Sequence, residues 1–374
     1  MKNSISRRNF IRTSGITLAS GLLASRIPAI AGPAYSPSDK WATEGIPLDK
    51  KLDPAWIKSL YERGVPTVYA KSRNELRYIG MPVGGINAGG VYLGGDGRLW
   101  LWDIFNDNRE GIEPKLVPWQ QQTTHSSYVR SRDGACYVEP AQNIRPLDQG
   151  FAFRFEYGGQ TIVKSLREAD WDEILFEAGY PVGTVRYIDK SLPVEITLRA
   201  FSPFIPLNED DSGLPATILS FTFKNTGTAA VKIAIAGWLE NKTGISSANE
   251  RKGYAGTTVC RRSNKAVRQT GLVAVDESLT LLEKAEELQQ RPDFGTMCIA
   301  ALNTDARAYA SVDTGNLSAL FNSEPADEMH KPVQEPLTGA VQTTLNLSAG
   351  AEAAADFVVS WYFPNLKIHD NIKD

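Results

Sequence analysis

The fold is decided by one stretch, which reads Gly80-Met81-Pro82-Val83-Gly84-Gly85-Ile86-Asn87-Ala88-Gly89-Gly90 and continues as Val91-Tyr92-Leu93-Gly94-Gly95-Asp96-Gly97-Arg98-Leu99-Trp100-Leu101-Trp102-Asp103-Ile104-Phe105-Asn106. Seven glycines fall within residues 80–95. Such a density is typical of backbone that takes positive φ or passes close to another surface. Two apolar segments flank Gly94-Gly95-Asp96-Gly97, and this composition predicts a tight hairpin turn.

The second arm of this hairpin, residues 99–105, is apolar on both faces apart from Asp103. Its large side chains alternate, with Trp100, Trp102 and Ile104 on one face. A strand of this kind is covered on both sides. We therefore expect one face to lie on the core of a sheet pair and the other to need a further layer, which is a loop, a helix or another domain.

A glycine-rich segment also invites a nucleotide-binding interpretation. The dinucleotide fingerprint needs glycines between a strand and a helix, and the phosphate-binding loop needs Gly-Lys-Ser/Thr. No helix pattern follows this segment, and Gly-Lys-Ser/Thr does not occur in it. The sequence therefore favours a structural turn.

The glycine stretch, the Gly-x-Asp-Gly turn and the Trp-rich strand ending in Phe105-Asn106 resemble the opening of the N-terminal domain of glycoside hydrolase family 116, the bile-acid β-glucosidase or non-lysosomal glucosylceramidase type. That family typically opens with Gly-Ile-Pro-Leu-Gly-Gly-Ile-Gly-Ala-Gly. Met81, Val83 and Asn87 are small departures from this pattern.

Residues 1–31 have the pattern of an export signal. Four basic residues precede an apolar stretch at 15–24, and Ala29-Ile30-Ala31 suits a signal peptidase. Ser6-Arg7-Arg8-Asn9-Phe10-Ile11 carries the twin-arginine signature of the route that exports folded proteins, the alternative being a general secretory signal with two chance arginines. We expect a periplasmic or extracellular protein without a membrane span, because the apolar stretch is shorter than the ~20 residues a bilayer needs.

Removal of the signal takes away five basic and no acidic residues, so the formal net charge falls from -3 to -8. This balance argues against nucleic acid or an anionic membrane as a partner. Cys136, Cys260 and Cys298 include no Cys-x-x-Cys pair and are interpreted as mostly buried small apolar residues. The three histidines lack ligand spacing, so neither a metal site nor a cofactor site is expected.

Strand patterns dominate the rest of the chain. Residues 151–157 and 161–166 flank Gly158-Gly159, and 184–188 precede 194–201, where apolar and polar residues alternate. A strand with one buried and one solvent-exposed face is typical of an antiparallel sheet that packs on the core with one side. Residues 216–224 and 230–239, separated by Asn225-Thr226-Gly227-Thr228, predict a further hairpin, and strands resume at 296–301, 308–312, 340–347 and 355–363.

Three segments have other patterns. Asp53 as N-cap and Pro54 in the first turn begin a short helix that ends before Gly64. Residues 244–265 are polar and Gly/Ser-rich, which predicts a surface excursion. Residues 276–290 carry Leu281, Leu282, Ala285 and Leu288 at helical spacing and predict a surface helix.

A second family-like segment reads Ser202-Pro203-Phe204-Ile205-Pro206-Leu207-Asn208-Glu209-Asp210-Asp211-Ser212-Gly213-Leu214-Pro215. Its three prolines predict an ordered loop. Its neighbouring carboxylates suggest acid/base chemistry or calcium, but carboxylates in a loop are more often turn or cap formers. A third match is the strand ending Trp361-Tyr362-Phe363-Pro364-Asn365, which is similar to the Trp-x-Phe-Pro-Asn end of the family domain.

The resemblance implies a mainly β fold, a large two-sheet antiparallel β-sandwich (supersandwich-like) with a few short helices. In the family an (α/α)6 helical barrel follows and supplies the glutamate nucleophile and aspartate acid/base of a retaining glycosidase, and no such carboxylate pair is marked here. We expect a non-catalytic sandwich, inactive alone, that packs on this catalytic domain in cis or in trans. The expected domains are a signal at 1–31, a leader with a short helix at 32–79, the sandwich at 80–365 and the start of a linker to an absent catalytic domain at 366–374.

Two segments are candidates for the interface with that domain. The two-faced strand contributes Trp100 and Trp102, and the proline loop contributes Phe204, Asn208 and Asp211. No residue is assigned to catalysis, to a cofactor or to a metal. These five residues are the site residues that the sequence predicts.

Two other functions stay open. A stand-alone carbohydrate-binding module stacks exposed aromatics on sugar rings, and it requires several of Trp100, Trp102, Trp119, Trp171 and Trp238 to line one open groove. A lyase or epimerase on a sandwich needs a histidine with a Tyr or Glu partner, for which the chain offers His125, His330 and His369.

Overall fold

Strands make up most of the computed structural model, which describes residues 53–62, 64–106, 116–118, 128–130, 147–248, 260–282 and 286–366. The strands are β1 (Thr67–Ala70), β2 (Met81–Pro82), β3 (Gly90–Leu93), β4 (Leu99–Asp103), β5 (Leu116–Pro118), β6 (Tyr128–Arg130), β7 (Gln149–Tyr157), β8 (Gln160–Ser165), β9 (Glu173–Gly179), β10 (Val182–Ile188), β11 (Val194–Phe201), β12 (Ala216–Asn225), β13 (Val231–Glu240), β14 (Cys260–Gln269), β15 (Leu272–Leu281), β16 (Thr296–Ala301), β17 (Arg307–Tyr309), β18 (Glu328–Pro332), β19 (Thr338–Leu347) and β20 (Glu352–Tyr362). The helices are α3 (Pro54–Tyr61), α4 (Glu209–Ser212) and α5 (Leu317–Leu320), with 3-10 turns η1 (Lys71–Arg73), η2 (Leu76–Tyr78), η3 (Glu168–Asp170) and η4 (Glu286–Gln290).

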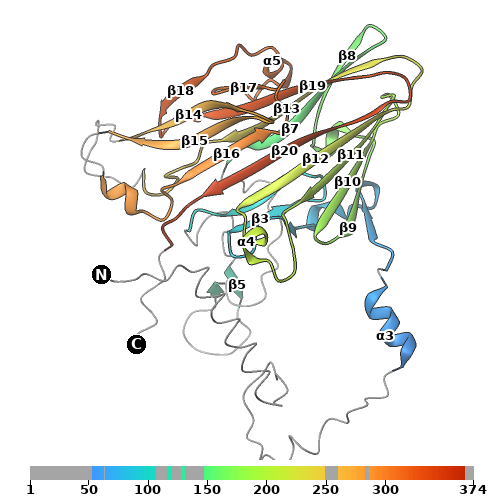
Figure 1. Cartoon of the computed structure of the whole chain (residues 1–374), viewed down its shortest axis with the longest axis horizontal. Coiled ribbons are helices and arrows are strands. Elements are labelled where there is room, and N and C mark those ends of the chain that lie inside the picture. Colours follow the sequence, from blue (N-terminus) through green and yellow to red (C-terminus); the bar gives the residue numbers. More distant parts are fainter. Residues whose placement is uncertain are drawn as a thin grey trace, which may run out of the picture. The chain divides into compact units, whose positions relative to one another are not determined.

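Two large antiparallel sheets form a sandwich, which confirms the fold class (Figure 1). One has ten strands in the order β1-β9-β10-β11-β12-β20-β16-β15-β14-β18, and the other has five in the order β17-β19-β13-β7-β8. Smaller sheets are formed by β2-β3-β4 and by β5-β6.

Phenylalanines fill the space between the two sheets. Phe151 and Phe153 of β7 meet Phe221 of β12, with ring centroids 5.0 and 5.3 Å apart, and Phe357 of β20 lies 5.1 Å from Phe151. All four are buried. Because each side chain lies on an inward position of its strand, period-2 alternation alone places it in the core.

The five-stranded sheet is covered on its outer face as well. Ala234, Ala236 and Trp238 of β13 point away from the phenylalanine core and pack in a second cluster with Leu320 and Phe321, at and just beyond the end of α5. This explains why β13 reads as a nearly continuous apolar run.

The hairpin expected from β12 and β13 is wrong, because the two strands belong to different sheets. β12 pairs with β11 and β20, whereas β13 pairs with β7 and β19. Asn225 holds the crossing between them: its Nδ2 donates to the carbonyls of Ala229 and Leu347 at 2.8 and 3.0 Å. Both edges of each strand are therefore already occupied. The hairpin expected at Gly158-Gly159, β7–β8, is confirmed, and the expected successive strands β10 and β11 pair with each other.

The glycine stretch forms the expected hairpin, β3–β4, with Leu93 opposite Leu99. Gly97 has a φ of +84° in its turn. At Gly85 a side chain is excluded because an added Cβ lies 2.1 Å from the carbonyl oxygen of Leu214. Both reasons for a glycine, positive φ and close approach, are thus present.

A β-bulge in β4 changes the expected alternation. The register shifts between Val91 and Tyr92, so that Trp102 lies opposite Val91 and Trp100 opposite Tyr92, while Leu101 takes a φ of +53°. The prediction that both tryptophans share a face is therefore wrong. Trp102 lies in the core, and Trp100 packs edge-on to Tyr92 and donates to the carbonyl of Ile79. The covering layer for Trp100 is a segment of this chain.

Two further predictions are wrong. Residues 276–281 end strand β15, and 286–290 form the short turn η4, in place of one helix. Every second residue of this strand is buried, and this alternation outweighs the helical spacing of the leucines; the buried residues are Val273, Val275, Glu277 and Leu279. The expected surface excursion ends in strand β14, where Arg262 and Asn264 are buried.

The chain divides into two compact units, residues 1–65 and 66–374. In the first, the Asp53 side chain caps α3 by accepting from the amide of Ala55 at 2.8 Å, as expected, with Pro54 in the first turn. In the second, β1 pairs with β9, so the unit begins ahead of the expected domain start at Gly80. The signal at 1–31 and residues 32–52 lie outside the described residues, as do 367–374 of the expected linker.

Candidate functional site

Six large apolar side chains are exposed on segments that meet at one end of the second unit. They form what we call the apolar end surface: Ile86, Tyr180, Phe204, Ile205, Leu207 and Leu214. Tyr180 and Phe204 are in edge-on contact, with ring centroids 5.7 Å apart. The amide of Ile86 donates to the carbonyl of Ser212 at 2.8 Å, which joins the glycine stretch to the proline loop. Figure 1 shows α4 of this loop beside β3.

The proline loop is held in one conformation by its own polar groups. Asn208 caps α4: its Oδ1 accepts from the amide of Asp211, and its Nδ2 donates to the Asp211 carboxylate at 2.7 Å. The hydroxyl of buried Ser212 accepts from the amide of Ile205 at 2.8 Å. Of the loop carboxylates, Asp211 therefore takes part in a cap, as the sequence indicates for this kind of cluster.

Strand β20, the last that the structure describes, anchors both segments. The Trp361 amide donates to the carbonyl of Pro215 at 3.0 Å, and its indole Nε1 donates to the carbonyl of Ala88 at 2.6 Å. Asn106 donates to the carbonyl of Phe363 at 2.8 Å. The three motifs that are far apart in the sequence therefore meet at this end.

Leu207 is held with its side chain entirely in solvent. Its φ is +65°, a left-handed conformation that costs an L-residue about 1–2 kcal/mol. Strained residues persist where the surrounding structure imposes them, and they cluster at binding sites. The left-handed backbone thus places the Leu207 side chain where a partner surface can reach it.

The structure brings three of the five predicted site residues together. Phe204 is 42% exposed, Asp211 is exposed and Asn208 is half-buried, all in the proline loop. Trp100 is half-buried under Ile79, and Trp102 is 0% exposed. Trp102 therefore contributes no exposed surface in this chain, because the β4 bulge turns it into the core. The apolar neighbours Ile86, Tyr180 and Leu214 were missed, since single apolar residues in loops give no periodic signal.

The tryptophans do not line an open groove in the part of the chain that the structure describes. Trp171 and Trp238 are buried, as is Trp102, and Trp100 is half-buried. Trp119 lies outside the described residues. Stacking of several exposed tryptophans on a sugar is thus not supported by those that are described.

A histidine beside a glutamate, the kind of pair that a lyase or epimerase needs, occurs on the outer strands of the ten-stranded sheet. His330 of β18 contacts the hydroxyl of Ser263 through Nδ1 at 2.6 Å and lies 3.3 Å from Glu328 through Nε2. Ser263 is buried, and its hydroxyl also contacts that of Thr280. Ser263 thus links His330 of β18 to Thr280 of β15, so we interpret this group as a cross-strand hydrogen-bond cluster. His125 and His369 lie outside the described residues.

Metal ligation has no support among the described residues, where no group of three His, Cys, Asp or Glu side chains is placed to hold an ion. Cys260 is buried and Cys298 half-buried, and burial raises the pKa of the Cys298 thiol, which keeps it neutral. Cys136 is not among the described residues. Within the same part of the chain, no helix is long and apolar enough to cross a membrane.

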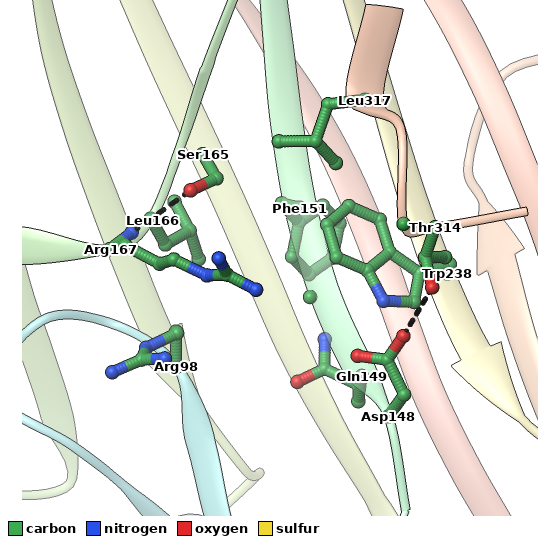
Figure 2. Close-up of a pocket in the computed structure, with 12 residues that line it drawn as sticks. Arg98, Asp148, Gln149, Phe151, Ser165, Leu166, Arg167, Trp238, Thr314 and Leu317 are labelled. Atoms are coloured by element: carbon green, nitrogen blue, oxygen red, sulfur yellow. Dashed lines mark hydrogen bonds between the residues drawn. The ribbon is translucent and has the colours of Figure 1, made fainter. Parts of the chain in front are cut away.

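A cavity of about 230 Å³ opens between the start of β7, the end of β8 and the segment that precedes α5. Figure 2 shows Gln149 and Trp238 on one wall and Arg167, from the segment between β8 and η3, facing them. Of the residues that line it, the sequence indicated only Trp238, as one of the tryptophans of a binding groove. The others come from separate strands and give no common signal.

Comparison with known proteins gives one strong match. The profile of the family described as beta-glucosidase 2, glycosyl-hydrolase family 116 N-term, matches residues 80–374. No curated protein sequence matches the chain significantly.

Solved structures give distant matches only. A polysaccharide lyase is 11% identical with a TM-score of 0.32, and the match covers 81% of this chain and 33% of that one. A kojibiose phosphorylase from the human microbiome is 10% identical with a TM-score of 0.27, over 59% and 23% of the two chains. An aldose 1-epimerase from Klebsiella pneumoniae is 11% identical with a TM-score of 0.30, over 74% and 77%. The chain thus spans about a third of the length of the lyase.

Proposed function

Because the chain belongs to the N-terminal domain family of glycoside hydrolase family 116, we propose that it is the non-catalytic sandwich of a β-glucosidase or glucosylceramidase-like enzyme. In this proposal it packs on an (α/α)6 catalytic domain, in cis or in trans, and supports that domain's active site. The barrel supplies the two carboxylates of glycoside hydrolysis, and the sandwich supplies none.

The observation that carries the proposal is the apolar end surface. Large exposed apolar patches are unusual on isolated monomers, and they mark interaction sites. Domain interfaces within one chain commonly bury on the order of 600 to 1,500 Å². The proline loop presents Phe204, Ile205 and Leu207 on a backbone fixed by its cap, so little conformational entropy is lost when a partner docks.

The test uses the purified chain and a separately produced family 116 barrel domain. We expect no turnover of an aryl β-glucoside by the chain alone, and a complex with the barrel in size-exclusion chromatography. Phe204→Asp and Leu207→Asp should weaken the complex at least tenfold, because each puts a charge into an apolar contact. Ile188→Asp is the matched control, since Ile188 is similarly exposed but ends β10 at the opposite end from Tyr180.

Two results would overturn the proposal. One is hydrolysis by the chain alone that a single Asp or Glu substitution within it abolishes. The other is equal barrel binding by the Phe204→Asp, Leu207→Asp and Ile188→Asp variants.

We also propose that residues 1–31 send the folded chain out of the cytoplasm by the twin-arginine route. The Arg7→Lys, Arg8→Lys double variant should remain in the cytoplasm, whereas Arg12→Lys should be exported normally. Unchanged export of the double variant would contradict this route, because a general secretory signal needs only positive charge.

A further inference from the structure

The cavity beside β7 contains polar groups that have no partner among the described residues. Gln149 is 3% exposed, and neither its Nε2 nor its Oε1 makes a hydrogen bond in the part of the chain that the structure describes. The indole Nε1 of Trp238, a residue that is 6% exposed, is also unpartnered. Buried polar atoms are nearly always satisfied, so these three atoms have hydrogen-bonding capacity left for water or for a ligand in the cavity.

Other polar groups of the cavity are already used. The Ser165 hydroxyl donates to the Asp170 carboxylate, and Arg98 is paired with Asp96. The Thr314 hydroxyl donates to one oxygen of Asp148 at 2.6 Å. These contacts fix the walls of the cavity and leave a defined set of groups for a ligand.

Arg167 adds a positive charge to that set. It lies two residues after the end of β8, at the N-cap position of η3, and its guanidinium makes no ion pair within the part of the chain that the structure describes. In Figure 2 the guanidinium points into the same space as the Gln149 amide. A guanidinium offers its donors in a planar fork that matches a carboxylate.

The opposite wall favours hydroxyl groups. Gln149 offers a donor and an acceptor side by side, and the second oxygen of Asp148 is turned toward Gln149 in Figure 2. The cavity therefore has a cationic side at Arg167 and a mixed donor and acceptor side at Gln149 and Asp148. A ligand that matches both sides carries a carboxylate at one end and hydroxyls at the other.

The volume limits the size of this ligand. About 230 Å³ gives room for one sugar ring. We propose that the cavity binds a single acidic monosaccharide, with its carboxylate on Arg167 and its hydroxyls on Gln149 and Asp148. None of these residues belongs to the apolar end surface, so this site goes beyond the docking function and is tested independently of it.

Isothermal titration of the full chain with glucuronate, glucose and acetate at equal ionic strength tests the proposal. We expect glucuronate to bind at least tenfold more tightly than either of the others, because a hydrogen bond to a charged group contributes about 1.5–3 kcal/mol. Arg167→Gln should remove the preference for glucuronate over glucose. Arg186→Gln, a change of an exposed arginine on β10, should leave it unchanged.

A second variant tests the other wall. Gln149→Leu keeps a side chain of similar volume but removes both unpartnered polar atoms, so it should weaken glucuronate binding tenfold while the thermal midpoint stays level or rises. Arg167 is exposed, so the arginine variant folds even where this one does not. The proposal is overturned by no saturable binding of glucuronate, by equal binding of glucuronate and glucose or acetate, or by unchanged glucuronate binding to Arg167→Gln.

Discussion

The phenylalanine core and the apolar end surface have similar side chains and opposite environments. Phe221 lies on a strand between two sheets and contacts the rings of Phe151, Phe153 and Phe357. Phe204 lies in a proline loop and contacts only the exposed ring of Tyr180 among the described aromatics. Apolar side chains on the inward positions of strands therefore stabilise the fold, whereas apolar side chains on a capped loop stay exposed for a partner to contact.

Truncation of the two phenylalanines should separate the regions most clearly. Phe221→Ala should lower the free energy of unfolding by about 3–5 kcal/mol, because it leaves a cavity among packed rings. Phe204→Ala should cost under about 1 kcal/mol, because its side chain is already 42% exposed. Urea denaturation measures both. Similar losses would show that the proline loop belongs to the core of the isolated chain.

The buried region also contains a carboxyl group, that of Glu277, which lies between the two sheets. It is 0% exposed and lies beside Gly339 of β19. Burial raises the pKa of Glu277 well above its ordinary 4.5. The backbone amide of Gly339 and the charge of Arg262 oppose the rise, and the charges of Glu240 and Asp276 add to it. The native state therefore holds this proton more tightly than the unfolded state does.

This shift has a definite sign for stability. The pKa of Glu277 is higher in the folded than in the unfolded state. The free energy of unfolding therefore falls as the pH rises above about 4.5, by up to ~1.4 kcal/mol per pH unit. Glu277→Gln should match the parent at pH 4 and be more stable by over ~1 kcal/mol at pH 8. Glu195→Gln, at an exposed position of β11, is the control. Urea denaturation midpoints at the two pH values measure this difference. If the free energy of unfolding depends on pH in the same way in the parent and in Glu277→Gln, the raised pKa of Glu277 is contradicted.

Leu207→Gly should have the smallest effect on folding. Glycine accepts the φ of +65° without strain, but it gives the unfolded chain more freedom, so the two terms nearly cancel and the change should stay within ~1 kcal/mol. Binding to a catalytic domain should nevertheless weaken, because the exposed leucine is lost. A destabilisation comparable to that of Phe221→Ala would show that Leu207 is packed in the free chain.

The fold was predictable from the sequence where local signals are strong. Alternation located β7, β11, β16 and β20, and the glycine turn located the β3–β4 hairpin. The assignment of strands to sheets was not predictable from the sequence. Nothing in Asn225-Thr226-Gly227-Thr228 distinguishes a hairpin turn from a crossing between two sheets. The difference depends on which distant strands occupy the edges of β12 and β13.

The candidate site was predictable in part for the same reason. The prolines and Asn208 indicated an ordered, capped loop that carries Phe204. A single bulge residue, Leu101, turned Trp102 into the core, and no composition signal marks a bulge there. The cavity at Gln149 and Arg167 depends on three-dimensional packing of separate strands, so the sequence alone could not indicate it.

Docking of a catalytic domain on the apolar end surface is tested by hydrogen–deuterium exchange of the chain with and without a family 116 barrel domain. We expect added barrel to slow exchange in residues 202–215 and 83–89, which carry most of the apolar end surface, and to leave the outer face of the five-stranded sheet around α5 unchanged. Protection confined to that outer face, or no protection at a large molar excess of barrel, would contradict docking at the apolar end surface.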